Sequence, residues 1–118
     1  SILQDNKDIN LVFAQNDRMA VGAYLSARQR QLEKEMLFVG IDALPGKGYG
    51  VEQVLEGVLD ATFIYPTGGD KVMQVAMDIL EKRPYERDTK LSTALVDKTN
   101  ARVMQLQTDH IAEQDGKI

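Results

Sequence analysis

The sequence predicts an α/β fold in which a parallel sheet is built from consecutive β-α-β units. Four apolar stretches alternate with stretches of helical spacing, in the order β-α-β-α-β-α-β. The first two, residues 9–14 and 36–41, are apolar at nearly every position, which is typical of parallel strands covered by helices. The chain has 118 residues, 43% hydrophobic and 27% charged, an ordinary balance for a soluble globular domain. We therefore expect parallel strands joined by right-handed connections.

The first β-α unit begins with the strand predicted over residues 9–14. Residues 15–17 read Gln-Asn-Asp and close this strand, and Asn or Asp at such a position caps the helix that follows. One face of that helix carries small and apolar residues at helical spacing: Ala20, Ala23, Tyr24 and Ala27. The polar residues 28–34 form its solvated end.

The second unit begins with the strand over residues 36–41, which ends at Asp42. A loop rich in glycine and proline follows, and then a short helix around residues 51–55. Gly57 stands where glycine commonly ends a helix.

The third unit begins with a strand over residues 60–65, which the Pro-Thr-Gly-Gly sequence of residues 66–69 interrupts. The helix after it is expected to end before Pro84, because a proline restricts the residue that precedes it. Its apolar stripe consists of Val72, Val75, Ala76, Ile79 and Leu80. The last strand is expected within residues 90–96.

From residue 99 onward the composition becomes polar and lacks proline. Met104, Ile111 and Ile118 lie seven residues apart, which is fewer heptads than a coiled coil needs. A linker helix and the start of a coiled coil are both compatible with this tail.

Composition and charge exclude several classes of function. The formal net charge of −4 disfavours nucleic-acid binding, and the absence of cysteine excludes disulfides, thiolate metal sites and cysteine nucleophiles. His110 is the only histidine and lies in the polar tail, so we expect no catalytic residue, metal site or cofactor. Residues 40–48 miss the spacing of a phosphate-binding loop. Because the chain begins with Ser1 and stops inside a helical pattern, we expect a piece of a longer protein.

Three predicted strand ends carry polar or aromatic side chains: Asp17, Asp42 and Tyr65. Ligands of open parallel α/β sheets bind outside the carboxyl ends of the strands. A carboxylate accepts hydrogen bonds from two adjacent sugar hydroxyls, and an aromatic ring offers a flat apolar face to a sugar. Alternatively, Asp17 is a helix cap and Asp42 a turn residue.

Three ordered motifs resemble type 1 periplasmic sugar-binding proteins and their lactose-repressor relatives. Residues 12–23 read Val-Phe-Ala-Gln-Asn-Asp-Arg-Met-Ala-Val-Gly-Ala, like the family's segment in which strand, Asn-Asp and helix follow directly. Residues 39–42, Val-Gly-Ile-Asp, resemble the next strand end, where Ala43 replaces the family's usual glycine. Residues 57–62, Gly-Val-Leu-Asp-Ala-Thr, match the start of the following strand. The resemblance covers residues 9–96.

The resemblance implies that residues 1–98 form the later half of the C-terminal lobe of a periplasmic-binding-protein-like domain, ending in a helix at residues 99–118. The helix over residues 70–83 would pack on the missing N-terminal lobe, with a crossing between lobes just after Tyr65. Asp17 then falls where the family hydrogen-bonds sugar hydroxyls, and Tyr65 where many members hold glutamine. Asp42 would lie near the cleft, and Asn16 would support the turn.

Residues 63–71 and 100–107 resemble more narrowly the periplasmic sensor domains of hybrid two-component proteins. This implies a non-enzymatic, periplasmic module that binds a small sugar and is tethered to the inner membrane, next to a histidine kinase, through downstream sequence. A free periplasmic receptor of a transporter and a receiver-like phosphotransfer domain are the alternatives. With the other lobe absent, the apolar helix stripe would be bare, so we expect a homodimer or swapped assembly.

Overall fold

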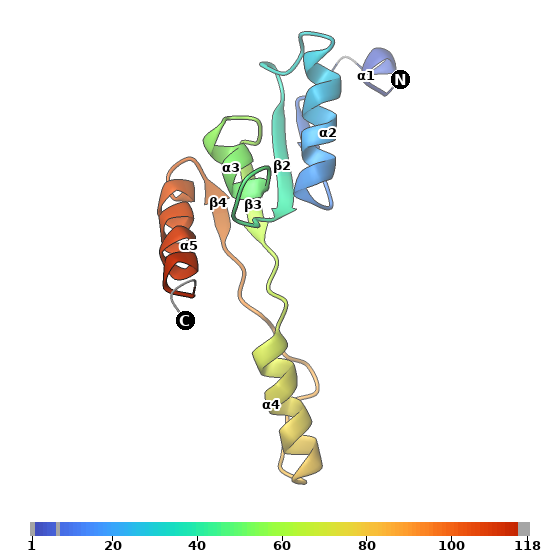
Figure 1. The fold of residues 1–118 in the computed structure, drawn as a ribbon. Coiled ribbons are helices and arrows are strands. Elements are labelled where there is room, and N and C mark those ends of the chain that lie inside the picture. Colours follow the sequence, from blue (N-terminus) through green and yellow to red (C-terminus); the bar gives the residue numbers. More distant parts are fainter. Residues whose placement is uncertain (1, 7, 116–118) are drawn as a thin grey trace.

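A four-stranded sheet with helices on one face forms the body of the protein, and one helix projects far from it (Figure 1). The computed structural model describes residues 2–6 and 8–115. In chain order the elements are α1 Ile2–Asp5, β1 Leu11–Phe13, α2 Asp17–Arg28, β2 Leu37–Asp42, α3 Gly50–Leu55, β3 Ala61–Ile64, α4 Gly69–Leu80, β4 Leu95–Asp97 and α5 Ala101–Asp115.

The α/β class and every strand and helix predicted from the sequence are confirmed. Strand β2 has the predicted length and starts one residue later, whereas β1, β3 and β4 are shorter than the stretches expected for them. The polar tail is helical over Ala101–Asp115, whereas residues 116–118 lie outside the described residues. The short helix α1 was not predicted.

The strand order is β1-β2-β3-β4, and the first three strands are parallel, as expected. The prediction of a wholly parallel sheet is wrong for β4, which runs antiparallel to β3, with Thr62 opposite Val96. The connection explains this direction. After β3 the chain leaves the sheet, forms α4 and returns along nearly the same path, so it re-enters from the end at which it left (Figure 1). A parallel strand needs a connection that crosses the sheet.

Helices α2 and α3 cover one face of the sheet and enclose the core. The largest fully buried side chains are Phe38, Leu59, Val51, Val54, Val96 and Thr62. The ring of Tyr24 on α2 meets Phe38 edge to face, with centroids 5.4 Å apart, which is a favoured aromatic geometry. The core therefore fixes α2, whose first residues adjoin the carboxyl end of β1.

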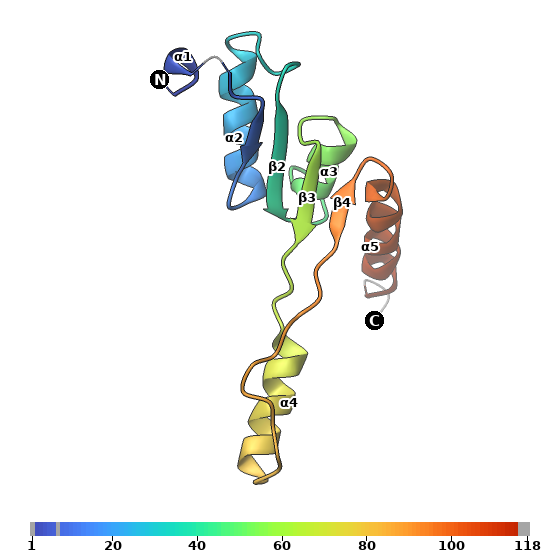
Figure 2. The same ribbon diagram turned by 180° about the vertical axis from the view of Figure 1, so that it is seen from behind.

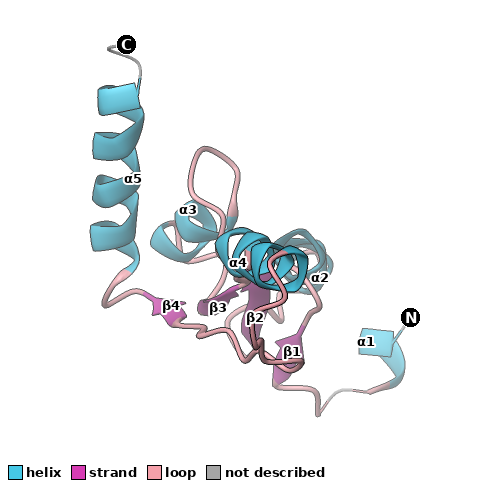
Figure 3. Ribbon diagram, turned by 90° about the horizontal axis from the view of Figure 1, so that it is seen from below, coloured by secondary structure: helices cyan, strands magenta, loops and turns pink. Residues whose placement is uncertain are grey.

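Helix α5 lies beside α3 at the β4 edge of the molecule (Figure 3). Ala101 at its start is fully buried, and Met104 packs against the core. In the part of the chain that the structure describes, no helix has both the length and the apolarity needed to cross a membrane.

The other face of the sheet is open. The strand residues Phe13, Leu37 and Leu95 are exposed, Phe13 by 60%. Seen from behind, the strands lie in front of these helices, and no described helix covers them (Figure 2). Both faces of the strands are apolar, but within residues 2–6 and 8–115 helices cover only one of them.

Helix α4 stands away from the sheet on two extended segments. The protein measures 58 × 38 × 21 Å, and its radius of gyration is 18.5 Å. A compact chain of this length would have a radius of gyration of about 13 Å. None of the residues of α4 is buried, and its exposed apolar side chains are Val72, Met73, Met77, Ile79 and Leu80. Of the stripe expected to be bare, Val72, Ile79 and Leu80 are exposed, whereas Val75 and Ala76 are half-buried. The packing partner of α4 and the expected dimer stay predictions.

Candidate functional site

The predicted site residues come together at one edge of the sheet, where β1, β2 and β3 end. Because these strands are parallel, their carboxyl ends share that edge. Asp42 ends β2 opposite Ile64 of β3, and the Tyr65 amide donates a 3.5 Å hydrogen bond to the Asp42 carbonyl. Asp17 follows β1 and is linked to the end of β2 by a hydrogen bond described below.

Asn16 caps helix α2. Its backbone is extended, and its Oδ1 accepts a hydrogen bond of 2.9 Å from the Met19 amide. This satisfies one of the amides that lack a partner in the first turn of a helix. The prediction that Asn16 supports the turn agrees with this contact, and its half-buried side chain also lines the pocket described below.

Asp17 is the first residue of α2, yet its side chain points into the protein and is only 5% exposed. Oδ1 accepts a 2.5 Å hydrogen bond from the Thr62 hydroxyl on β3. Oδ2 accepts a 3.0 Å hydrogen bond from the Ala43 amide after β2. One carboxylate thereby ties the start of α2 to the ends of two strands.

Two glycines make room for the Asp17 carboxylate. A Cβ atom at Gly40 or at Gly50 would overlap the oxygens of Asp17, so neither position tolerates a side chain while the carboxylate stays in place. Gly40 lies on β2 and Gly50 begins α3. Helix α2, which carries Asp17, strand β2 and helix α3 therefore together form the space that holds the carboxylate.

Burial raises the pKa of the Asp17 carboxyl group above its ordinary value, because the charged form loses hydration. The hydrogen bonds from Thr62 and from the Ala43 amide favour the charged form and oppose the shift, whereas the nearby charge of Asp42 adds to it. The net direction is upward.

The backbone turns sharply directly after β2. Asp42 has φ of 122° and Ala43 has φ of 50°, and neither residue is glycine. L-residues with a side chain rarely adopt positive φ, and each such residue costs about 1–3 kcal/mol unless its surroundings fix it. The turn aims the half-buried Asp42 side chain at the strand-end edge.

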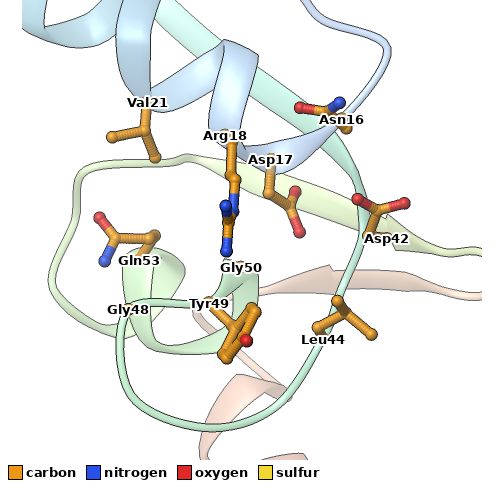
Figure 4. A pocket seen from close by; sticks show the side chains of 10 residues that line it. All are labelled: Asn16, Asp17, Arg18, Val21, Asp42, Leu44, Gly48, Tyr49, Gly50 and Gln53. Atoms are coloured by element: carbon orange, nitrogen blue, oxygen red, sulfur yellow. The ribbon is translucent and has the colours of Figure 1, made fainter.

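A pocket of about 340 Å³ lies beside this turn, between the starts of α2 and α3 (Figure 4). Asn16, Asp17 and Asp42 line it together with residues that the sequence reading missed: Arg18, Val21, Leu44, Gly48, Tyr49, Gly50 and Gln53. The Arg18 guanidinium lies 5.8 Å from the centre of the Tyr49 ring. Arg18 directly follows the Asn-Asp pair, and Tyr49 ends the glycine-rich loop. Their positions next to these predicted features could have indicated that they line the site.

Tyr65 does not line this pocket. Its side chain is 67% exposed and borders a separate hollow on the open face of the sheet, with Phe13, Ile41, Phe63, Ile64, Pro66, Leu91 and Thr93. The structure thus places the four predicted residues on one edge, but divides them between two adjoining surfaces.

The arrangement suits binding of a neutral polar molecule. The Asp42 carboxylate accepts hydrogen bonds, the Arg18 guanidinium donates them, and the Tyr49 and Tyr65 rings offer apolar faces. Within the described ranges, no three His, Cys, Asp or Glu side chains are grouped so as to hold a metal ion.

No protein-family model and no curated protein matches the chain. Solved structures do match, and the class they define is that of periplasmic sugar-binding domains. The fold of this chain is therefore that of part of a lobe of such a domain.

One match is the fructose-binding periplasmic domain of a hybrid two-component system, with 64% identity and a TM-score of 0.88 over 98% of this chain. A solute-binding protein of an ABC transporter from Actinobacillus succinogenes, solved with D-allose, has 26% identity and a TM-score of 0.73 over 86% of the chain. Another from Bacillus halodurans, solved with myo-inositol, has 27% identity and a TM-score of 0.72 over 88%. The chain spans only 39%, 36% and 36% of these three solved chains, respectively.

Proposed function

We propose that this chain is part of the sugar-binding periplasmic sensor domain of a hybrid two-component protein. It supplies one wall of the sugar cleft, and the rest of the domain supplies the other. The observation that carries this proposal is the gathering of Asn16, Asp17, Asp42 and Tyr65 at the carboxyl edge of three parallel strands. The 64% identity to a fructose-binding domain supports D-fructose as the first sugar to test.

In the proposed cleft, Asp42 accepts hydrogen bonds from sugar hydroxyls, and the exposed ring of Tyr65 contacts an apolar face of the sugar. The Asn16 side chain borders the same edge. Asp17 supports the turn after β2 and does not contact the sugar, since both of its oxygens already accept hydrogen bonds from Thr62 and Ala43. This differs from the direct sugar contact that the family resemblance implies for Asp17.

Helix α4 is the proposed contact with the missing lobe. The segments on either side of it, residues 65–68 and 81–94, leave and rejoin the sheet next to the site. A sugar that binds the closed arrangement of the two lobes better shifts the population toward it. We propose that this shift reaches a membrane-bound histidine kinase through α5, which directly follows β4.

Calorimetric titration of the complete periplasmic domain with D-fructose tests the assignment of the site. Asp42→Ala is expected to weaken binding by about tenfold or more, because charge-assisted hydrogen bonds to the sugar are lost. Glu35→Ala is the matched control, since the exposed Glu35 lies before β2, at the opposite end of that strand. Its affinity should equal that of the native domain.

An unchanged affinity of a folded Asp42→Ala variant would remove Asp42 from the cleft wall. If the domain binds another sugar instead of fructose, the proposed ligand is wrong, but the proposal of a sugar-binding domain stands. The parent gene tests the sensor role: a membrane-spanning segment and a kinase region after residue 118 support it, whereas a stop soon after this residue would indicate a free transport receptor.

A further inference from the structure

The turn at Asp42 and Ala43 has a backbone conformation that residues with a side chain rarely adopt. Both residues have positive φ, at 122° and 50°. An alanine in the left-handed region places its Cβ atom close to the following carbonyl oxygen, so a free chain would leave this conformation for a more common one. Something in the folded protein must hold the turn.

The contact that holds it is the hydrogen bond from the Ala43 amide to Asp17 Oδ2, 3.0 Å long and buried. The acceptor itself is fixed, because Thr62 donates to Oδ1 at 2.5 Å and α2 fixes the backbone of Asp17. Gly40 and Gly50 leave room for the carboxylate and for no side chain of their own. The Asp42 carbonyl accepts a longer hydrogen bond, of 3.5 Å, from the Tyr65 amide.

Asp17 has little surface to offer a sugar directly. Its side chain is almost entirely buried, and each oxygen already accepts one hydrogen bond from the protein. Asp42, by contrast, is half-buried and lines the pocket.

We propose that Asp17 is a positioning residue, whose buried carboxylate holds the left-handed turn at Ala43 and thereby presents the Asp42 carboxylate to the sugar. This role rests on the proposed function, in which Asp42 contacts the sugar. It requires an acceptor at position 17 and a held turn at position 43. It does not require a negative charge that touches the ligand.

The test combines changes at positions 17 and 43 in the complete periplasmic domain, titrated with D-fructose by calorimetry. Asp17→Ala removes the acceptor, and binding is expected to weaken by about tenfold, since the competent turn becomes a minor conformation. Adding Ala43→Gly should recover most of that loss, because glycine adopts positive φ without the steric cost. Ala43→Gly alone should change affinity by about twofold at most, because the turn is already held.

Asp17→Asn separates positioning from direct contact. Asparagine has the same shape, and its Oδ1 can accept from Ala43 while its amide donates to the Thr62 hydroxyl. The expected loss of affinity is about threefold or less, since the turn stays anchored. If the carboxylate itself touched the sugar, Asp17→Asn would lose charge-assisted hydrogen bonds and weaken binding by about tenfold, and Ala43→Gly would not restore the affinity of Asp17→Ala.

Two outcomes would overturn the positioning role while leaving the proposed function standing: a tenfold loss in folded Asp17→Asn, or the absence of rescue by Ala43→Gly. If Asp17→Ala does not fold, Asp17→Asn decides the question alone by the same threshold. A native domain that binds no sugar would overturn the proposed function and, with it, this role. Circular dichroism and thermal unfolding of each variant show whether a loss of binding reflects a loss of fold.

Discussion

The carboxyl group of Asp17 occupies a place that acidic side chains seldom occupy, since they are almost never fully buried unless they are paired. Here hydrogen bonds from Thr62 and Ala43 compensate for lost hydration only in part, and the pKa of the group stays above its ordinary value of 3.8. The folded protein therefore binds this proton more tightly than the unfolded chain does.

This raised pKa predicts a specific pH dependence of stability. Because the folded state retains the proton better, the contribution of protonated Asp17 to stability is fully present below pH 3.8 and is lost as pH rises through the raised pKa. Compared with Asp17→Asn, the native domain should therefore lose free energy of unfolding as pH increases across this window. Urea unfolding of both proteins at a series of pH values measures the difference, in which contributions from most other groups cancel.

A stability difference that stayed constant, or that grew in favour of the native protein with rising pH, would contradict the raised pKa.

The sequence singled out Asp17, Asp42 and Tyr65 by their positions after strands, and the structure places them at one edge because parallel strands end on a common edge. Their contact with a sugar stays a prediction. The sequence could not reveal the orientation of the side chains. The burial of Asp17 depends on the absence of side chains at Gly40 and Gly50, which are 23 and 33 residues away along the chain. Tyr49 lines the pocket because of the path of the loop that precedes it, and the periodicity of apolar residues does not predict the path of a loop.

At the scale of elements, Gly68 occupies the junction between the segment that leaves β3 and helix α4. It has φ of 69°, and a Cβ atom there would lie 2.7 Å from Leu91 Cδ1 on the returning segment. Glycine therefore lets the two segments run close together at the base of α4.

Gly68→Ala is expected to lower the free energy of unfolding of the complete domain by about 1–2 kcal/mol, mainly through the cost of positive φ. Gly69→Ala is the matched control, because Gly69 is helical and a Cβ atom there would meet nothing within 4 Å. It should leave stability unchanged or raise it by up to about 1 kcal/mol. Urea unfolding of the two variants compares them directly, and equal effects of both would contradict the interpretation of Gly68.

The direction of β4 shows where sequence patterns stop being informative. The alternation of strands and helices predicts crossovers, and each predicted element lies in or next to the segment that its pattern indicated. The pattern of α4 is that of any amphipathic helix, however, and it does not say whether the apolar stripe faces the sheet or points elsewhere. Because α4 packs on no strand, the chain returns antiparallel.

On the scale of the whole molecule, two apolar surfaces are exposed within the described residues: the exposed apolar side chains of α4 and the open face of the sheet. Contiguous apolar surface of this kind drives association when its normal partner is absent. This chain spans 39% of the matched fructose-binding domain, and we propose that the remainder of such a domain covers both surfaces.

We therefore expect residues 1–118 alone to self-associate at micromolar concentration in analytical ultracentrifugation. Leu80→Glu should weaken association by about tenfold or more, since burial of a leucine contributes about 1.5–3 kcal/mol. Gln74→Glu introduces the same charge at an exposed polar position of α4 and should have little effect. A compact, stable monomer across the concentration range would contradict this expectation.

The antiparallel pairing of β3 and β4 also makes the projecting arm separable from the sheet. The Ile64 amide donates a 3.0 Å hydrogen bond to the Ala94 carbonyl, so the arm starts and finishes at neighbouring positions of one ladder. Antiparallel neighbours can be joined by a two-residue hairpin loop. Replacing residues 65–93, which include α4, with an Asn-Gly loop would thus leave every remaining strand pair intact. The product would be a smaller protein that consists of the sheet and the helices packed on it.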